Sequence, residues 1–230
     1  MKTRHPLRRI FASAALVAMT FAAAPAFAKT KTWSFDKDKV QEPPVGWLSE
    51  KTGQGSKGDW KVVADPTAPS RPNVLAQLSA DATVYRFPLA IVEKTAYKDL
   101  VISVRFKAIS GARDQGAGLV WRFRDAYNYY LVRANALENN VVLYKVQDGN
   151  RIALAPKGTS AETYGVKTRV PRNAWNQLRV EVKGNLFAVF LNGQRLFDVE
   201  DSTFVEGGKI GLWTKSDSVI YFDDLTAEGE

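Results

Sequence analysis

Short runs in which apolar and polar residues alternate extend along most of the chain and indicate β-strands. In residues 100–108 the even-numbered positions are all apolar, whereas the odd-numbered positions are Val101, Ser103, Arg105 and Lys107. Because successive side chains of a strand point to opposite faces, this alternation places one face on a core and the other toward solvent.

The central part of the chain predicts a meander of three strands. Residues 119–124 and 129–135 alternate, with Leu119, Trp121, Phe123, Tyr130, Val132 and Ala134 expected to face inward. Leu131 fits its outward position least well. In residues 141–147 both alternating sets of positions contain apolar residues, so the sequence does not decide which set faces the core. Asp148-Gly149 is a tight hairpin signal.

The second half predicts further short strands and no helical period. Residues 178–183 and 186–191 are joined by Gly184-Asn185, and Asn192-Gly193 is a strong hairpin signal before residues 195–199. Runs at 210–214 and 219–227 follow. About a dozen strands in all indicate an all-β domain of two packed antiparallel sheets, spanning residues 29–230.

The first 28 residues have the three parts of a signal peptide. A basic start with Lys2, Arg4, Arg8 and Arg9 precedes an apolar run that ends in Ala26-Phe27-Ala28. Cleavage after Ala28 predicts a periplasmic or secreted protein that is not embedded in a membrane. Arg8-Arg9-Ile10-Phe11 partly fits the twin-arginine signal, but the general secretory route is favoured.

The net charge and the residue types that the chain lacks limit which kinds of catalysis and binding it can perform. The segment before Lys29 carries four of the 32 Lys and Arg and none of the 24 Asp and Glu, so its removal lowers the net charge from +8 to +4 and weakens a nucleic-acid interpretation. The chain has no Cys, and its one His is His5. The mature chain therefore cannot use Ser-His-Asp or Cys-His catalysis, disulfides, or His-ligated metals.

Two stretches carry a resemblance to a known superfamily. They are Gly118-Leu119-Val120-Trp121-Arg122 with Asn128-Tyr129-Tyr130, and Gly208-Lys209-Ile210-Gly211-Leu212-Trp213 with Tyr221-Phe222-Asp223-Asp224. They resemble concanavalin A-like lectins and glucanases, and most nearly the bacterial 3-keto-disaccharide hydrolase-like family, itself similar to laminin G-like modules. The resemblance implies a jelly-roll β-sandwich. It says little about activity, because this fold hosts lectins, glycosidases and adhesion modules.

Outward residues of the meander form the first candidate site. If the strands are neighbours, one concave surface collects cations, aromatic rings and an amide that can bind a glycan or sugar derivative. The alternatives are a merely solvated face and, for Trp213, a place in the core. The candidate ligand-binding residues are Arg122, Arg124, Tyr129, Arg133, Asn135, Trp213 and Lys215.

A calcium site is the second candidate. The resemblance implies that the first and last strands share a sheet, which would bring Asp36 or Asp38 near Asp223 or Asp224. Paired carboxylates repel one another unless a cation lies between them. The alternative, turn-forming residues or partners in salt bridges, is favoured because the spacing matches no dedicated calcium loop.

Glycoside hydrolysis is the third candidate. Laminarinase-like glucanases of the superfamily carry Glu, Asp and Glu at alternate positions of one strand, and Asp198-Val199-Glu200 offers only two of the three. The favoured function is therefore a monomeric sugar-binding module. The alternatives are a hydrolase or lyase acting on a modified 3-keto-disaccharide and a laminin G-like module that binds protein.

Overall fold

The computed structural model describes Met1 and residues 30–230, and the predicted signal peptide lies, apart from Met1, outside the described residues. Sixteen β-strands and no helix occur in this part of the chain, which therefore contains no helix that could cross a membrane. The strands are β1 Lys31–Trp33, β2 Trp47–Gly53, β3 Trp60–Ala64, β4 Asn73–Gln77, β5 Arg86–Val92, β6 Leu100–Ser110, β7 Gly116–Asp125, β8 Asn128–Asn135, β9 Asn140–Gln147, β10 Asn150–Leu154, β11 Val166–Lys167, β12 Asn176–Lys183, β13 Leu186–Leu191, β14 Gln194–Glu200, β15 Lys209–Thr214 and β16 Val219–Gly229.

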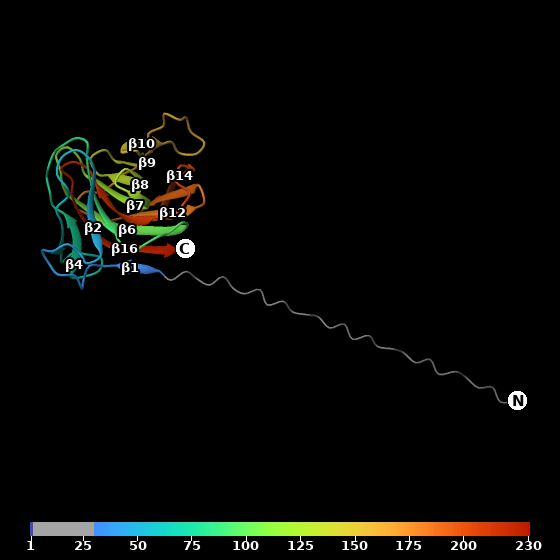
Figure 1. The fold of residues 1–230 in the computed structure, drawn as a ribbon, viewed down its shortest axis with the longest axis horizontal. Coiled ribbons are helices and arrows are strands. Elements are labelled where there is room, and N and C mark those ends of the chain that lie inside the picture. The colour runs from blue at the N-terminus through green and yellow to red at the C-terminus, as the bar shows by residue number, and fades with distance from the viewer. Residues whose placement is uncertain (2–29) are drawn as a thin grey trace.

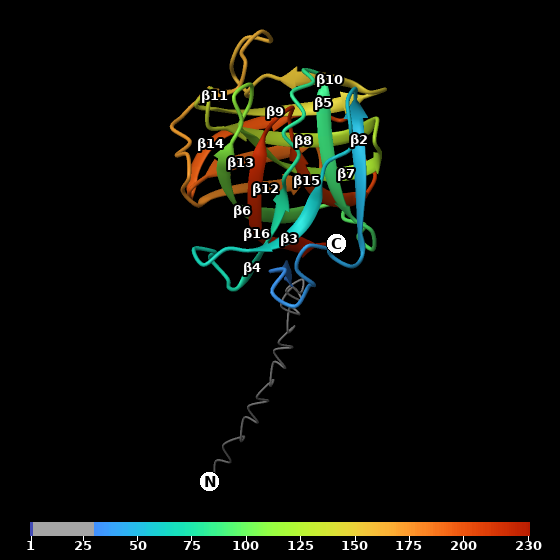
Figure 2. The same ribbon diagram turned by 90° about the vertical axis from the view of Figure 1, so that its left-hand side faces the viewer.

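The strands form two antiparallel sheets that pack face to face, which confirms the predicted sandwich (Figure 1). Sheet A has the order β14-β13-β12-β6-β16-β4-β3, with β1 beside β16. Sheet B has the order β10-β9-β8-β7-β15-β5-β2, with β11 beside β9. The chain crosses repeatedly between the layers, so neighbours in each sheet often come from distant segments (Figure 2).

The main core lies between the sheets and contains most of the side chains predicted to face inward. Trp121 of β7 stacks on Tyr130 of β8, with ring centroids 5.6 Å apart and planes 20° apart. It meets Phe187 of β13 edge-on at 5.4 Å. The aromatic contacts therefore join sheet B to sheet A, and their burial stabilises the sandwich.

One inward prediction is wrong. Phe123 lies in a second apolar cluster, because the pairing of β7 with β8 shifts between Trp121 and Asp125. The bulge begins at Arg122, whose φ is 46°. A bulge adds a residue to one strand and so exchanges the faces of the residues that follow. The alternation before it does not reveal this exchange.

The second apolar cluster covers the outer face of sheet B. Its buried members are Phe87, Leu89, Ile91, Val120, Phe123, Tyr129, Leu131, Val142, Tyr144, Val146 and Trp213. It explains why Leu131 fitted a wet face poorly. It also settles the facing of β9: Val141 and Leu143 enter the main core, whereas Val142 and Tyr144 enter the outer cluster. The predicted wet outer surface is therefore largely dry.

Sheet B is dry on its outer face because it curls. In the sheet order β2 lies four strands from β8, a separation of roughly 19 Å in a flat sheet. Yet the Thr52 hydroxyl in β2 lies 2.8 Å from the Tyr129 hydroxyl in β8 and donates to the Ala126 carbonyl at 2.5 Å. The outer face of sheet B is therefore strongly concave, and its centre is enclosed.

Candidate functional site

Polar side chains gather at one end of the concave face of sheet B. Arg133 and Asn135 come from the end of β8, Glu138 from the turn that follows, and Asn140 from the start of β9. Asp114 stands just before β7, and Lys215 stands just after β15. We call this set the charged rim: Asp114, Arg133, Asn135, Glu138, Asn140 and Lys215.

The charged rim is a connected network. Arg133 donates from Nη2 to Glu138 Oε2 and to Asn140 Oδ1, both at 2.8 Å. Asn135 donates to Asp114 Oδ1 at 2.8 Å, and Lys215 Nζ lies 2.5 Å from Asp114 Oδ2. Buried ions require such partners, since an unpaired charge in a dry environment is strongly unfavourable.

The turn between β8 and β9 holds Glu138 in place. The Asn135 side-chain oxygen accepts the backbone N–H groups of Leu137 and Glu138, at 2.9 and 3.1 Å. Asn139 follows with a φ of 49°, a conformation that Asn tolerates better than most residues. The strand end therefore fixes where the carboxylate of Glu138 stands.

The two carboxyl groups of the charged rim have pKa values shifted in opposite directions. Burial raises the pKa of Asp114 above its ordinary value, although the Lys215 ammonium opposes this. Burial also acts to raise the pKa of Glu138, but the Arg133 guanidinium and the Asn140 amide outweigh it and hold that pKa below its ordinary value. Two carboxyl groups whose pKa values differ in this way can act as an acid and a base.

Only part of the charged rim meets solvent. The side chains of Glu138 and Lys215 are 37% and 17% exposed, whereas Arg133 is fully buried. Beside them Tyr164 is exposed, and its hydroxyl lies 2.5 Å from that of Tyr144. A ligand would therefore meet Glu138, Lys215 and Tyr164, while Arg133 positions Glu138 from beneath.

The structure brings five of the seven predicted ligand-binding residues to the concave face: Tyr129, Arg133, Asn135, Trp213 and Lys215. Two of them are not available as flat surfaces for a sugar. Tyr129 and Trp213 are fully buried, and Trp213 stacks on Phe87 with centroids 5.5 Å and planes 17° apart. These two rings therefore build the floor of the site.

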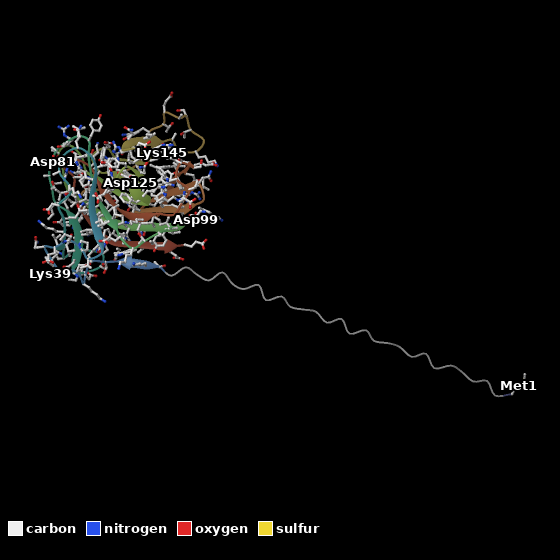
Figure 3. All side chains as sticks on the ribbon, in the orientation of Figure 1. Met1, Lys39, Asp81, Asp99, Asp125 and Lys145 are labelled. Atoms are coloured by element: carbon white, nitrogen blue, oxygen red, sulfur yellow. The ribbon has the colours of Figure 1, made fainter. Side chains whose placement is uncertain are left out.

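Arg122 and Arg124 lie elsewhere, at the bulge of β7. The buried Arg122 guanidinium donates to the backbone carbonyls of Lys98, Gly184 and Phe204. It also approaches Asp99, which Figure 3 shows on the opposite side of the sandwich from Asp81. Arg124 is exposed and lies 5.0 Å from the Phe204 ring. The prediction of a single surface that includes these two arginines is wrong, because the bulge turns them away.

Asp36 and Asp223 are each occupied by hydrogen-bond donors. The Asp36 carboxylate accepts the Asn73 backbone N–H at 3.1 Å, and Asp223 accepts the backbone N–H and the hydroxyl of Ser70 at 2.9 and 3.0 Å. Burial raises the pKa of Asp223 to about 6. No group of three or more His, Asp or Glu side chains that could hold a metal ion occurs in residues 30–230. The partners of Asp36 and Asp223 are neutral backbone and hydroxyl donors.

Sequence reasoning missed Asp114, Glu138 and Asn140. All three stand at the ends of strands, where acidic and amide residues are ordinary turn formers. Their one signal was proximity: Glu138 and Asn140 follow Asn135 within the hairpin that joins two strands of the predicted meander. Asp114 becomes a neighbour only through the packing of the sheet.

Comparisons with known proteins give a family match for most of the chain and a shared fold with solved structures. Residues 46–228 match a family described as the 3-keto-alpha-glucoside-1,2-lyase-like domain. A levanase of Bacillus subtilis (strain 168) is 28% identical over 123 residues, which are 52% of this chain and 16% of the levanase. The chain thus matches a small part of that longer protein.

Solved structures with the same fold include a carbohydrate-binding module. The module CBM66 from Bacillus subtilis has a TM-score of 0.59 and 21% identity, and the match covers 80% of this chain and 96% of the module. The cellulose-induced protein Cip1 also has a TM-score of 0.59, at 10% identity, with 87% and 97% covered. At these identities the likeness shows the fold.

Proposed function

Because the chain belongs to the 3-keto-alpha-glucoside-1,2-lyase-like domain family, as its sequence resemblance predicted, we propose that it binds a sugar or sugar derivative at the charged rim of sheet B. The observation that carries the proposal is the convergence of Glu138, Lys215 and Tyr164 at the open end of a concave, otherwise dry face. The fold that the chain shares with a carbohydrate-binding module supports it.

Each exposed member of the charged rim suits part of a sugar. The Glu138 carboxylate accepts hydrogen bonds from ring hydroxyls, the Lys215 ammonium donates them, and the exposed Tyr164 ring offers a flat apolar surface. Arg133 acts as a positioning residue, because its hydrogen bonds fix the orientation of Glu138. The half-open rim retains bridging water, so affinity for a single sugar unit is modest.

Replacing Glu138 with Gln tests the proposal. The variant keeps the shape but loses one acceptor and the charge, and we expect affinity to fall about tenfold or more, since a charge-assisted hydrogen bond contributes roughly 1.5–3 kcal/mol. The measurement is calorimetric titration with neutral, acidic and 3-keto disaccharides.

Glu181→Gln is the matched control, because the Glu181 side chain is about as exposed as that of Glu138 and also pairs with an arginine, Arg179, on sheet A. It should leave binding unchanged. Equal losses in the two variants, or no binding by the wild-type protein across the series, would contradict the proposal.

A second candidate function is elimination from a 3-keto-glucoside, and the opposite pKa shifts of Asp114 and Glu138 favour it. In this reaction a base removes the proton from C2, a double bond forms between C1 and C2, and the C1–O bond breaks. The leaving oxygen takes up a proton. Glu138, which its lowered pKa keeps ionised, is the group that can take the proton, and the pair of Asp114 and Lys215 can supply a proton to the leaving oxygen.

The lyase has a direct optical signature. Elimination produces a double bond conjugated with the C3 ketone, which absorbs in the ultraviolet. If the wild-type protein forms this product, Glu138→Gln should slow it by about 100-fold or more, as expected for loss of a general base, and Glu181→Gln should not. Absence of the absorbance with the wild-type protein would leave sugar binding as the function.

Export and a monomeric state also belong to this proposal. The predicted signal peptide supports a location in the periplasm or outside the cell. Mass spectrometry of the secreted fraction should find a chain that begins at Lys29, and sedimentation should give a monomer. A cytoplasmic chain that retains Met1 would overturn the export proposal.

A further inference from the structure

A pocket opens where the end of β2 approaches the hairpin between β9 and β10. Its volume is about 350 Å³, within the range of pockets that hold small molecules. The exposed ring of Tyr85 stands at its rim. We call it the Arg151 pocket, and it is lined by Gly53, Gln54, Tyr85, Phe87, Gly149, Asn150 and Arg151.

Arg151 lies in this pocket among aromatic rings. Its guanidinium carbon lies 4.7 Å from the Phe87 ring centroid, 4.6 Å from that of Tyr144 and 5.7 Å from that of Trp213. Rings in this position hold a cation by cation–π attraction and also exclude water from it. They supply no acceptor for its N–H groups.

Arg151 differs in this respect from the three fully buried arginines. Arg86 and Arg122 donate to backbone carbonyls, and Arg133 pairs with Glu138 although its Nε has no partner. Arg151 makes no side-chain hydrogen bond or salt bridge within residues 30–230. Within residues 30–230, Arg151 Nη1 is buried and has no hydrogen-bond partner, and none of the pocket-lining residues is acidic. A buried donor without an acceptor is unfavourable, and such groups in native proteins are rare and ask for an explanation.

We propose that the Arg151 pocket binds the carboxylate-bearing unit of an acidic saccharide, a hexuronate. The proposal rests on the sugar-binding function above and names its substrate class. The carboxylate accepts hydrogen bonds from the Arg151 guanidinium, which can donate two in parallel. Because the rings exclude water, this interaction is stronger than it would be in open solvent.

The rest of the pocket suits the sugar that carries the carboxylate. The side chains of Gln54 and Asn150 can donate to and accept from ring hydroxyls, and Tyr85 offers an exposed flat ring. The backbone at Gly53 has a φ of 78°, and a Cβ there would lie 2.0 Å from the Tyr85 carbonyl oxygen. Glycine at this position therefore permits the close approach of the two strand ends that forms the wall.

The Arg151 pocket adjoins the charged rim. The Tyr144 ring centroid lies 5.7 Å from the Arg133 guanidinium carbon and 4.6 Å from that of Arg151, so the two carbons are no more than about 10 Å apart. One short oligosaccharide can therefore contact both zones. Its acidic unit would occupy the Arg151 pocket, and the neighbouring unit would meet Glu138 and Lys215.

The test compares a glucuronate-terminated disaccharide with its neutral glucose-terminated counterpart in calorimetric titrations of the full mature protein. The wild-type protein should bind the acidic sugar about tenfold or more tightly than the neutral one, since hydrogen bonds to a charged partner differ by this much from their neutral counterparts. Arg151→Met should abolish the preference. Arg151→Lys keeps the charge but loses the planar pair of N–H donors, so it should retain part of the preference.

Arg195→Met is the control, because Arg195 lies near the ring of Phe190 on sheet A and pairs with Asp198. It should keep the preference. Inorganic phosphate added alone should compete weakly, and competition as strong as that of the acidic disaccharide would overturn the assignment to a saccharide. Unchanged preference in Arg151→Met would overturn the role of Arg151.

The outcomes separate this inference from the function on which it rests. If the neutral and acidic sugars bind with equal affinity and Glu138→Gln binds neither, the inference is overturned and the proposed function stands. Binding of no sugar by the wild-type protein would overturn both. If Arg151→Met loses binding of the acidic sugar and Glu138→Gln does not, the inference holds and the binding site is the Arg151 pocket rather than the charged rim.

Discussion

Replacing Arg122 with Met should lower the free energy of unfolding by about 3–5 kcal/mol, because it leaves several backbone carbonyls without their donor. The guanidinium serves Phe204 and Gly184, each at 2.7 Å, and Lys98 at 2.9 Å. These carbonyls belong to three separate loops, so the side chain links segments that lie far apart in the sequence. Thermal unfolding should show a midpoint lower by roughly 10 °C.

Arg124→Met is the control for this substitution. Arg124 is exposed and has one contact of note, with the Phe204 ring. We expect a change of about 0.5 kcal/mol, the size of an exposed cation–π contact. Equal effects of the two substitutions on unfolding would contradict a structural role for Arg122, and loss of sugar binding in a stable Arg122→Met protein would return it to the binding site.

Trp213→Ala should cost about 3–5 kcal/mol, as expected for truncating a buried Trp. The ring is fully buried against Phe87 and Arg151 on the concave face of sheet B. Its removal leaves a cavity in a second core that the curl of the sheet encloses. Chemical denaturation of the variant measures the loss.

Tyr85→Ala separates this effect from that of an exposed ring. Tyr85 is 65% exposed at the rim of the Arg151 pocket, so its removal should change stability by no more than about 0.5 kcal/mol. The same variant should weaken binding of an acidic sugar. A Trp213→Ala protein as stable as Tyr85→Ala would show that the outer cluster is not a packed core.

The strands and the two-sheet architecture follow from the sequence because alternation is a local property. Leu119, Trp121 and Tyr130 face the main core as predicted. In β9 the competing sets reflect burial on both faces, and a strand of this kind reads as a nearly continuous apolar run. The open facing of residues 141–147 was thus a signal of a second buried face.

The curl of sheet B could not be read from alternation. It brings Thr52 to Tyr129, 77 residues apart in the chain, and it converts an outward face from wet to dry. The bulge of β7 also has no local signature, since Arg122 and Arg124 alternate with apolar residues as they would in a regular strand. Both features depend on contacts between distant segments.

The candidate site was predictable where it lies on strands and unpredictable where it lies at strand ends. Arg133, Asn135 and Lys215 alternate with core residues, and the pattern places them on one face. Asp114 and Glu138 stand beside turns, where acidic residues are common and do not by themselves indicate a site. Arg151 follows the predicted Asp148-Gly149 turn, and its position over the concave face comes from the approach of β2.

The most direct test of the central claim is a crystal structure of the mature protein soaked with a glucuronate-containing disaccharide. The sugar should occupy the concave face of sheet B, with its carboxylate against Arg151 and its neighbouring unit between Glu138 and Lys215. Sugar bound to sheet A, or beside Arg124 at the end of β7, with the concave face vacant, would contradict the claim.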